Sequence, residues 1–233
     1  MPSDAGSYSP CPPKGKPCVI LPVGDSITAG SQSSTGGGYR LPLFSLANKN
    51  MKSITFVGAN ASGPATVDGL PFPRANSGYS GYIIDTVAGR QGISQFFPAQ
   101  IVKYKPNIIL LMIGTNDVGA GETDGPARLA TLMDTMLNAD PSLLLVVAQI
   151  VPIQKATPDT RNMQIQAFNA PIPGLVKTRA DAGKHVKVVD MYGAFTANPN
   201  YSTAYLANQL HPNDTGYAVM ADTWYAAIGS LLH

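Results

Sequence analysis

The chain has few charged residues, and none of its segments concentrates them. Asp, Glu, Lys and Arg make up 13% of the 233 residues, about half of the usual share, and the formal net charge is +2. No stretch gathers Lys and Arg, as a nucleic-acid-binding protein would. No apolar run reaches the roughly 18 residues that a membrane span needs. We therefore expect no nucleic-acid partner and no membrane partner, and we expect a monomer.

Cysteine is almost absent, with Cys11 and Cys18 close together in CPPKGKPC. We expect a disulfide between them that pins the tail ahead of the first strand, with two free thiols as the alternative. Residues 1–17 contain no apolar core of a signal peptide. The two close cysteines, the low charge and three Asn-X-Ser/Thr sequons nevertheless favour a secreted, extracellular protein over an intracellular one. The sequons begin at Asn60, Asn200 and Asn213.

Five short runs rich in Val, Ile and Leu predict strands that are buried on both faces, as in a parallel sheet. They lie at 18–23, 53–58, 107–114, 142–149 and 185–190. Helical segments are predicted between and after them, at 39–48, 83–104, 126–138, 162–182 and 212–232. Pro171 and Pro173 should break the fourth helix or shift its boundary.

This alternation predicts an α/β protein with three α/β/α layers and a flavodoxin-like, five-stranded parallel sheet. Residues 1–17 are expected to form an irregular arm, and residues 18–233 a single domain. Long loops follow several strands, and such sheets bind ligands beyond the carboxyl ends of their strands.

Polar residues follow two strands that are neighbours if the strand order is 2-1-3-4-5. Ser26 comes just after the first strand, in VGDSITAG, and Asn116 just after the third, in IGTNDV. Taken alone, each is better explained as a turn or capping residue. Together they suggest a nucleophile beside an amide that donates to an oxyanion.

Two further segments complete the set. Gly81 lies in SGYSGYI and is either a plain turn residue or a backbone N–H donor. Of the three histidines, only His211 joins a long loop to a helix, in NQLHPND. Imidazole titrates near neutrality and serves as a general base when it is not structural.

In this order, GDSIT, GYSG, GTND and HPND resemble the motifs of the SGNH (GDSL) hydrolase superfamily, and within it the carbohydrate esterase family 3 acetylxylan esterases. The resemblance covers nearly the whole chain. It implies that Ser26 is the nucleophile, that His211 is the base, and that Ser26, Gly81 and Asn116 donate to the oxyanion. No cluster of metal-ligating residues is visible, and we expect no cofactor.

The chain departs from this pattern at Asn208, where the family has aspartate three residues before the histidine. Three arrangements remain open. Asn208 or a backbone carbonyl orients the imidazole of a Ser-His dyad; another carboxylate, Asp190 or Asp214, replaces the missing one; or the enzyme is weakened or inactive.

We expect a secreted serine esterase that removes O-acetyl groups from plant cell-wall polysaccharide, most readily acetylxylan. Tyrosines near the active edge are candidates for stacking on sugars. The alternatives are a broad esterase, another polysaccharide deacetylase or a lysophospholipase of the same fold, and a non-catalytic carbohydrate-binding homologue. The candidate tyrosines are Tyr39, Tyr79, Tyr82 and Tyr205.

Overall fold

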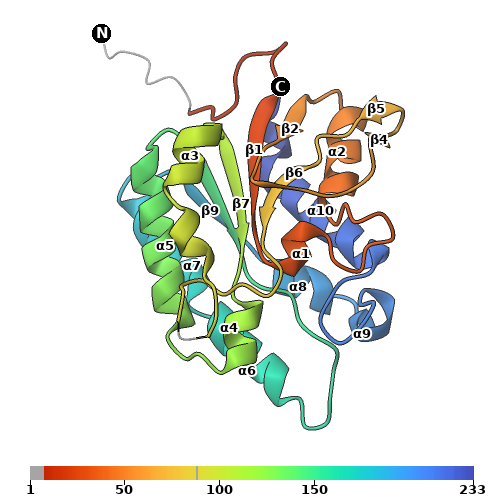
Figure 1. Cartoon of the computed structure of the whole chain (residues 1–233), viewed down its shortest axis with the longest axis vertical. Coiled ribbons are helices and arrows are strands. Elements are labelled where there is room, and N and C mark those ends of the chain that lie inside the picture. The colour runs from red at the N-terminus through yellow and green to blue at the C-terminus, as the bar shows by residue number, and fades with distance from the viewer. Residues whose placement is uncertain (1–7, 88) are drawn as a thin grey trace.

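A mostly parallel β-sheet forms the centre of the molecule (Figure 1). The computed structural model describes residues 8–87 and 89–233. The five predicted strands are present and run parallel in the order β2-β1-β7-β8-β9, which is the 2-1-3-4-5 order of a flavodoxin-like sheet. They are β1 (Cys18–Gly24), β2 (Ile54–Phe56), β7 (Ile108–Met112), β8 (Leu144–Ala148) and β9 (Val186–Val189).

The sheet is larger than predicted. Strand β6 (Ala75–Gly78) pairs in parallel with the end of β1, and β3 (Asn60–Ala61) pairs with β6 in the antiparallel direction. A two-stranded hairpin of β4 (Thr66–Val67) and β5 (Leu70–Pro71) lies in the same long loop. The sequence of β6 is ANSG, which has no β-branched or aromatic residue, so propensity alone does not reveal it.

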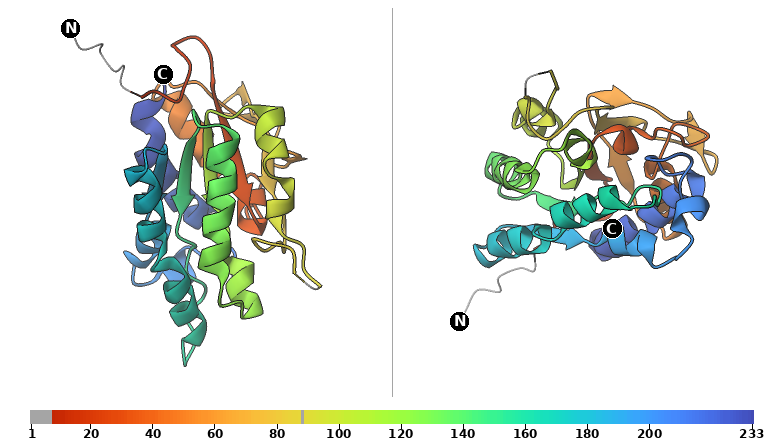
Figure 2. Two further views of the ribbon diagram at one scale, coloured as in Figure 1. Left: turned by 90° about the vertical axis from the view of Figure 1, so that its left-hand side faces the viewer. Right: turned by 90° about the horizontal axis from the view of Figure 1, so that it is seen from below.

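Helices cover both faces of the sheet (Figure 2). On one face lie α3 (Ala99–Tyr104) and α5 (Gly125–Ala139). On the other lie α2 (Arg40–Lys49), α7 (Ile172–Asp181) and α10 (Asp214–Ile228), which continues into a 3-10 turn at Gly229–Leu231. The predicted three layers are therefore present. No helix in the described ranges has the length and apolar character that crossing a membrane requires.

The core is built on the two central strands. Every residue of β7 and β8 is buried, which is why their sequences are continuous apolar runs and do not alternate. From α10, Tyr217, Met220 and Trp224 pack into this core along one face of the helix. The predicted apolar face of the last helix is thus confirmed.

The predicted helix over 83–104 is wrong for most of its length. The chain turns back between Ile83 and Gly92, because these two residues pair and the N–H of Ile83 donates to the carbonyl of Gln91. A Cβ on Gly92 would lie 2.2 Å from the backbone of Asp85, so only glycine allows this return. A 3-10 turn follows at Ile93–Phe96, and α3 begins only after Pro98.

The fourth predicted helix is divided where its prolines indicate. Helix α6 (Thr160–Asn169) ends before Pro171, and α7 begins at Ile172. The structure adds four short helices that periodicity does not reveal. They are α1 (Ser26–Ala29), α4 (Thr115–Ala120), α8 (Met191–Thr196) and α9 (Tyr201–Ala204).

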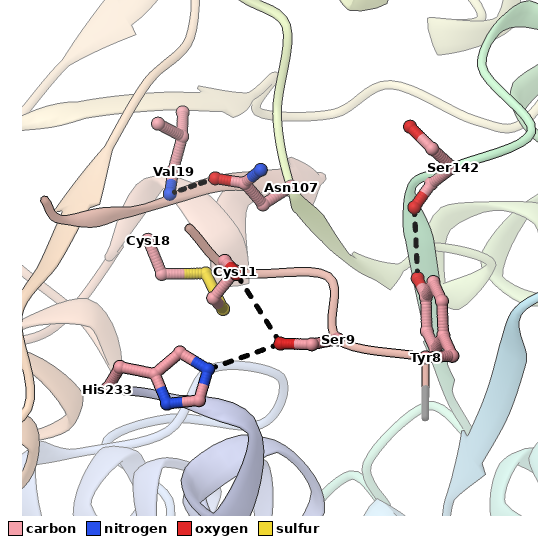
Figure 3. Close-up of a disulfide and its surroundings, with 8 residues drawn as sticks. All are labelled: Tyr8, Ser9, Cys11, Cys18, Val19, Asn107, Ser142 and His233. Atoms are coloured by element: carbon pink, nitrogen blue, oxygen red, sulfur yellow. Dashed lines mark hydrogen bonds between the residues drawn. A yellow bond between two sulfur atoms is a disulfide. The ribbon is translucent and has the colours of Figure 1, made fainter. Parts of the chain in front are cut away.

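The arm lies at the amino-terminal edge of the sheet, and its predicted Cys11–Cys18 disulfide is present (Figure 3). The Tyr8 ring stacks on His185, with 3.4 Å between ring centroids, and its hydroxyl donates to the carbonyl of Ser142. The Ser9 hydroxyl lies 3.2 Å from Nε2 of His233. The arm therefore holds the C-terminus, far from the carboxyl ends of the strands. Residues 1–7 of the predicted arm lie outside the described residues.

Candidate active site

Ser26 and His211 meet at the carboxyl edge of the sheet. Ser26 is the first residue of α1, directly after β1, and its neighbour Asp25 caps that helix by accepting the N–H of Ile27. The side chain of His211 reaches Ser26 from the loop before α10, with Oγ and Nε2 2.9 Å apart. Ser26 is only 7% exposed. This is the geometry of a serine whose proton passes to a base.

Three N–H donors surround the same edge. The ends of β6, β1 and β7 are aligned, since Gly24 pairs with both Gly78 and Met112. The predicted donors Ser26, Gly81 and Asn116 each follow one of these strand ends by a few residues. Their origin on adjacent strands explains how residues so far apart in sequence come to the same place.

No hydrogen bond within the described ranges uses the backbone N–H of Ser26 or Gly81. Ser26 is the first residue of α1, where a backbone N–H has no partner within the helix. Gly81 is exposed and has φ of 81°, a left-handed conformation that favours glycine. The Asn116 amide donates one hydrogen to the carbonyl of Tyr82, at 2.9 Å. That bond orients the amide and leaves its second hydrogen available.

Asn208 does not orient the imidazole, in contrast to the first of the three arrangements. Its Oδ1 accepts from the backbone N–H groups of Leu210, at 2.9 Å, and His211, at 2.8 Å. The side chain thereby shapes the turn that carries His211. The Nδ1 atom of the imidazole is buried and has no hydrogen-bond partner among the described residues.

The two substitute carboxylates also have other partners. Asp190 is exposed and caps α8 by accepting the N–H of Gly193 at 2.6 Å. Asp214 accepts the N–H of Ser34 at 3.0 Å. Neither bonds to His211, so the second arrangement is also wrong in this structure. What remains is a Ser-His pair, and burial without a nearby carboxylate lowers the pKa of His211.

Two buried carboxylates lie under the site. Asp25 is 1% exposed, and burial raises its pKa to about 7. Asp117 is fully buried and accepts the N–H of Ile84, and burial raises its pKa to about 6. Asp25 bonds within its own turn, whereas Asp117 holds the segment at Ile84 against the turn after β7.

The predicted tyrosines divide into two groups. Tyr39 is fully buried, and its ring lies 5.9 Å from that of Trp224, so it is a core residue and the prediction that it binds substrate is wrong. Tyr205 is partly buried and packs edge-on against Phe195. Tyr79 and Tyr82 are half-buried and border Gly81, which keeps them as candidates for substrate contact.

Sequence reasoning missed Arg40, a fully buried residue that ties the nucleophile helix to the long loop after β2. Its guanidinium donates to the carbonyls of Thr28 and Ala29 at the end of α1, and to groups of Ser62 and Arg74 in the loop. Burial lowers the pKa of Arg40 to about 10. The partners of Arg40 are mostly backbone carbonyl oxygens, which every residue carries, so no local sequence pattern predicts its role.

Within the described ranges, no three side chains of His, Cys, Asp or Glu gather as a metal site would require.

Comparisons with known proteins agree with this geometry. Residues 23–219 match the model of the GDSL-like Lipase/Acylhydrolase family. A Clostridium thermocellum family 3 carbohydrate esterase is 31% identical in sequence and superposes with a TM-score of 0.77, over 93% of this chain and 98% of that one. A carbohydrate esterase family 3 structure from Talaromyces cellulolyticus is 22% identical, with a TM-score of 0.71 over 92% of this chain and 97% of that one.

A curated relative is longer than this chain. The "Multidomain esterase" of Ruminococcus flavefaciens is 32% identical over 230 residues. That match covers 91% of this chain but only 28% of the relative.

Proposed function

Because the chain belongs to the GDSL-like lipase/acylhydrolase family, we propose that it is a serine esterase that removes O-acetyl groups from plant cell-wall polysaccharide, with acetylxylan as its substrate. The observation that carries the proposal is the 2.9 Å contact between Ser26 Oγ and His211 Nε2 at the carboxyl edge of the sheet. The 31% identity with a family 3 carbohydrate esterase supports a carbohydrate ester as the substrate class.

In the proposed mechanism, Ser26 and His211 share one proton. Oγ of Ser26 attacks the acetyl carbonyl carbon while Nε2 of His211 takes the hydroxyl proton. The carbonyl oxygen becomes an oxyanion, which the N–H groups of Ser26, Gly81 and Asn116 stabilise. The bond to the sugar oxygen then breaks, and that oxygen takes the proton from His211. The products of this half-reaction are a free sugar hydroxyl and acetyl-Ser26.

Water completes the cycle. His211 accepts a proton from a water molecule, whose oxygen attacks the carbonyl carbon of acetyl-Ser26. Acetate leaves, and Oγ of Ser26 regains the proton from His211. In both halves the imidazole carries its positive charge without a carboxylate at Nδ1, because position 208 is an amide and Asp190 and Asp214 bond elsewhere. We therefore expect a slower enzyme than one with a complete triad.

The direct test compares acetate release from acetylated xylan by the parent and by Ser26→Ala. We expect the variant to lose at least about 10³-fold in rate, as nucleophile removal does in serine hydrolases. Equal rates for the two proteins would sink the mechanism. If the parent cleaves p-nitrophenyl acetate but no acetylated xylan, the protein is an esterase and acetylxylan is not its substrate.

A second candidate function is hydrolysis of esters with longer acyl chains. It is favoured by a cavity of about 260 Å³ between α4, α5 and α6. Its walls include Val118, Pro126 and Phe168, and Val118 lies two residues after Asn116. Turnover of p-nitrophenyl esters from acetate to octanoate separates the candidates, since only a longer-chain esterase gains from filling an apolar cavity.

We also propose that the enzyme acts outside the cell. A buried disulfide at Cys11–Cys18 supports it, since such bonds persist mainly in oxidising compartments. Recovery of the active protein only from the cytosol of its source would contradict this part alone. We also propose that the enzyme is a monomer, which light scattering tests.

A further inference from the structure

A second cavity, which neither Ser26 nor His211 lines, takes no part in the mechanism above. It has a volume of about 260 Å³ and lies between the loop that follows α1 and the first turns of α10. Its lining includes Ser34, Thr35, Leu41, Asp214 and Ala218. The cavity is thus built from the two segments that directly follow the nucleophile and the base in sequence.

Hydrogen bonds connect this cavity to the catalytic pair. The N–H of Ser31 donates to the carbonyl of Ser26 at 3.0 Å, and the hydroxyl of Tyr217 donates to the carbonyl of Ser31 at 2.7 Å. Tyr217 lines the cavity. On the other side, Asp214 follows His211 by three residues and accepts the N–H of Ser34. A ligand seated here would therefore lie against a wall that is hydrogen-bonded to the segment of Ser26 and that contains Asp214, three residues after His211.

The lining combines polar and apolar groups in the manner of a sugar site. The hydroxyls of Ser34 and Thr35 make no hydrogen bond within the described part of the chain, and both residues are exposed. Leu41, Pro42 and Ala218 supply apolar surface. Sugar rings need both kinds of contact, because they carry hydroxyl groups at the edge and C–H groups on the face. The volume lies below the roughly 300–1,000 Å³ typical of sites for drug-sized ligands, which suits one ring better than a long segment.

We propose that this cavity is a subsite for one neutral sugar ring of the polysaccharide, next to the residue whose acetyl group reaches Ser26. The inference rests on the proposed function and names the part of the chain that selects the polymer. Among the described residues that line the cavity, Asp214 is the sole charged one, and none is Lys or Arg. A carboxylate disfavours a uronic acid at this place, so the subsite selects a xylan-type backbone over a pectic one.

Filling the cavity tests the subsite. In Ala218→Phe, a ring replaces a methyl group that lines the cavity. The matched control is Ala226→Phe, an exposed position two turns further along the same helix. The readout is the ratio of kcat/KM on an acetylated xylo-oligosaccharide to kcat/KM on p-nitrophenyl acetate. We expect the ratio to fall about tenfold in Ala218→Phe, mainly through KM, and to stay at the parent value in Ala226→Phe.

A second variant keeps the test decisive if the phenylalanine disturbs the fold. Thr35→Val replaces an exposed hydroxyl by a methyl group of similar size. Loss of one hydrogen bond to the sugar should lower the same ratio by roughly three- to tenfold. If Thr35→Val and a correctly folded Ala218→Phe both keep the parent's ratio of kcat/KM values, the proposal that this cavity is a sugar subsite is wrong. A parent that cleaves p-nitrophenyl acetate but not the acetylated oligosaccharide would instead overturn the polysaccharide substrate of the proposed function and keep the esterase.

A separate measurement tests whether the carboxylate of Asp214 disfavours a uronic acid. We expect the parent to prefer an acetylated xylo-oligosaccharide to an acetylated oligogalacturonide, and Asp214→Asn to narrow that preference. Equal rates of the parent on the two oligosaccharides would remove the assignment of a neutral sugar.

Discussion

Asn208 holds His211 by its backbone and not by its ring, since the amide oxygen accepts the N–H of His211 at 2.8 Å while Nδ1 of the imidazole has no partner in the described part of the chain. The same oxygen also accepts the N–H of Leu210. The side chain is therefore a positioning residue for the turn. It affects the imidazole only by placing the ring. It does not pair with the positive charge that develops on the ring during catalysis.

Asn208→Asp should raise kcat. One carboxylate oxygen can keep the two backbone bonds, and the second becomes an acceptor for Nδ1–H of His211. In serine proteases the reverse change costs about 10⁴ in turnover, which sets the upper bound, and we expect a gain of at least about tenfold. The measurement is kcat on p-nitrophenyl acetate. An unchanged kcat would mean that the imidazole needs no acceptor.

Asn208→Ala is the complementary change. It removes the acceptor of two backbone N–H groups, so the turn before His211 loosens. We expect a lower kcat and a loss of only about 1 kcal/mol in the free energy of unfolding, because the two bonds are exposed and water can replace the lost acceptor. Parental activity in this variant would show that the turn holds His211 without the side chain.

The pH profile should report the pKa of His211. The base acts only when its imidazole is neutral, so kcat/KM rises with pH through this pKa and then levels off. Burial lowers the pKa of His211, which extends the plateau below the ordinary imidazole range. In Asn208→Asp the new carboxylate stabilises the imidazolium, and the limb should move to higher pH. If the rising limb of the profile does not move in Asn208→Asp, the pKa that it reports does not belong to His211.

Asn116→Ala should lower kcat far more than it raises KM. The variant loses one oxyanion donor, and such losses cost roughly 10²–10³ in rate. It also loses the bond from the amide to the carbonyl of Tyr82. The effect should appear on p-nitrophenyl acetate, where sugar contacts play no part. A change confined to KM would assign Asn116 to substrate binding.

Much of the fold could be predicted because its strands are continuous apolar runs. Such runs fix β7 and β8 whatever surrounds them, whereas β6, with the sequence ANSG, exists only because the end of β1 offers it partners. The return of the chain at Gly92 was missed for a related reason. It depends on a close backbone approach between residues that local periodicity does not connect.

In the candidate site, residue types were predictable and contacts were not. A serine, an asparagine and a histidine after successive strands indicate an edge where they can meet. Which atom Asn208 bonds depends on the turn geometry of three residues, and a side-chain oxygen near several N–H groups has no unique partner in a sequence. Arg40 is hidden for the same reason, since its partners are mainly carbonyl oxygens that every residue carries.

Asp25→Asn should stabilise the protein above neutral pH. Burial raises the pKa of Asp25 to about 7 in the folded protein, from 3.8. The unfolded chain therefore loses this proton first, and stability present below the unfolded pKa of 3.8 is lost as pH rises from there through the folded pKa of about 7. The amide cannot ionise and can still accept the N–H of Ile27. We expect a gain of a few kcal/mol at pH 9 and little at pH 4, since one pKa unit corresponds to about 1.36 kcal/mol.

Urea unfolding at the two pH values measures this difference. Asp222→Asn, at an exposed position of α10, is the matched control and should change neither value. A gain of the same size at pH 4 and pH 9 would mean that ionisation of Asp25 is not its cause.

Arg40→Lys should destabilise the protein and slow catalysis, although it keeps the positive charge. One ammonium group cannot reach the carbonyls of Thr28 and Ala29 together with the groups of Ser62 and Arg74. Each buried carbonyl left without a partner costs about 1–3 kcal/mol, so we expect a loss of at least about 3 kcal/mol in the free energy of unfolding. Because Thr28 and Ala29 end the nucleophile helix, kcat should fall as well. Arg161→Lys, at an exposed position, controls for the exchange itself, and urea unfolding and kcat are measured on both. If Arg40→Lys keeps the parent's stability, these hydrogen bonds do not hold the nucleophile helix to the loop.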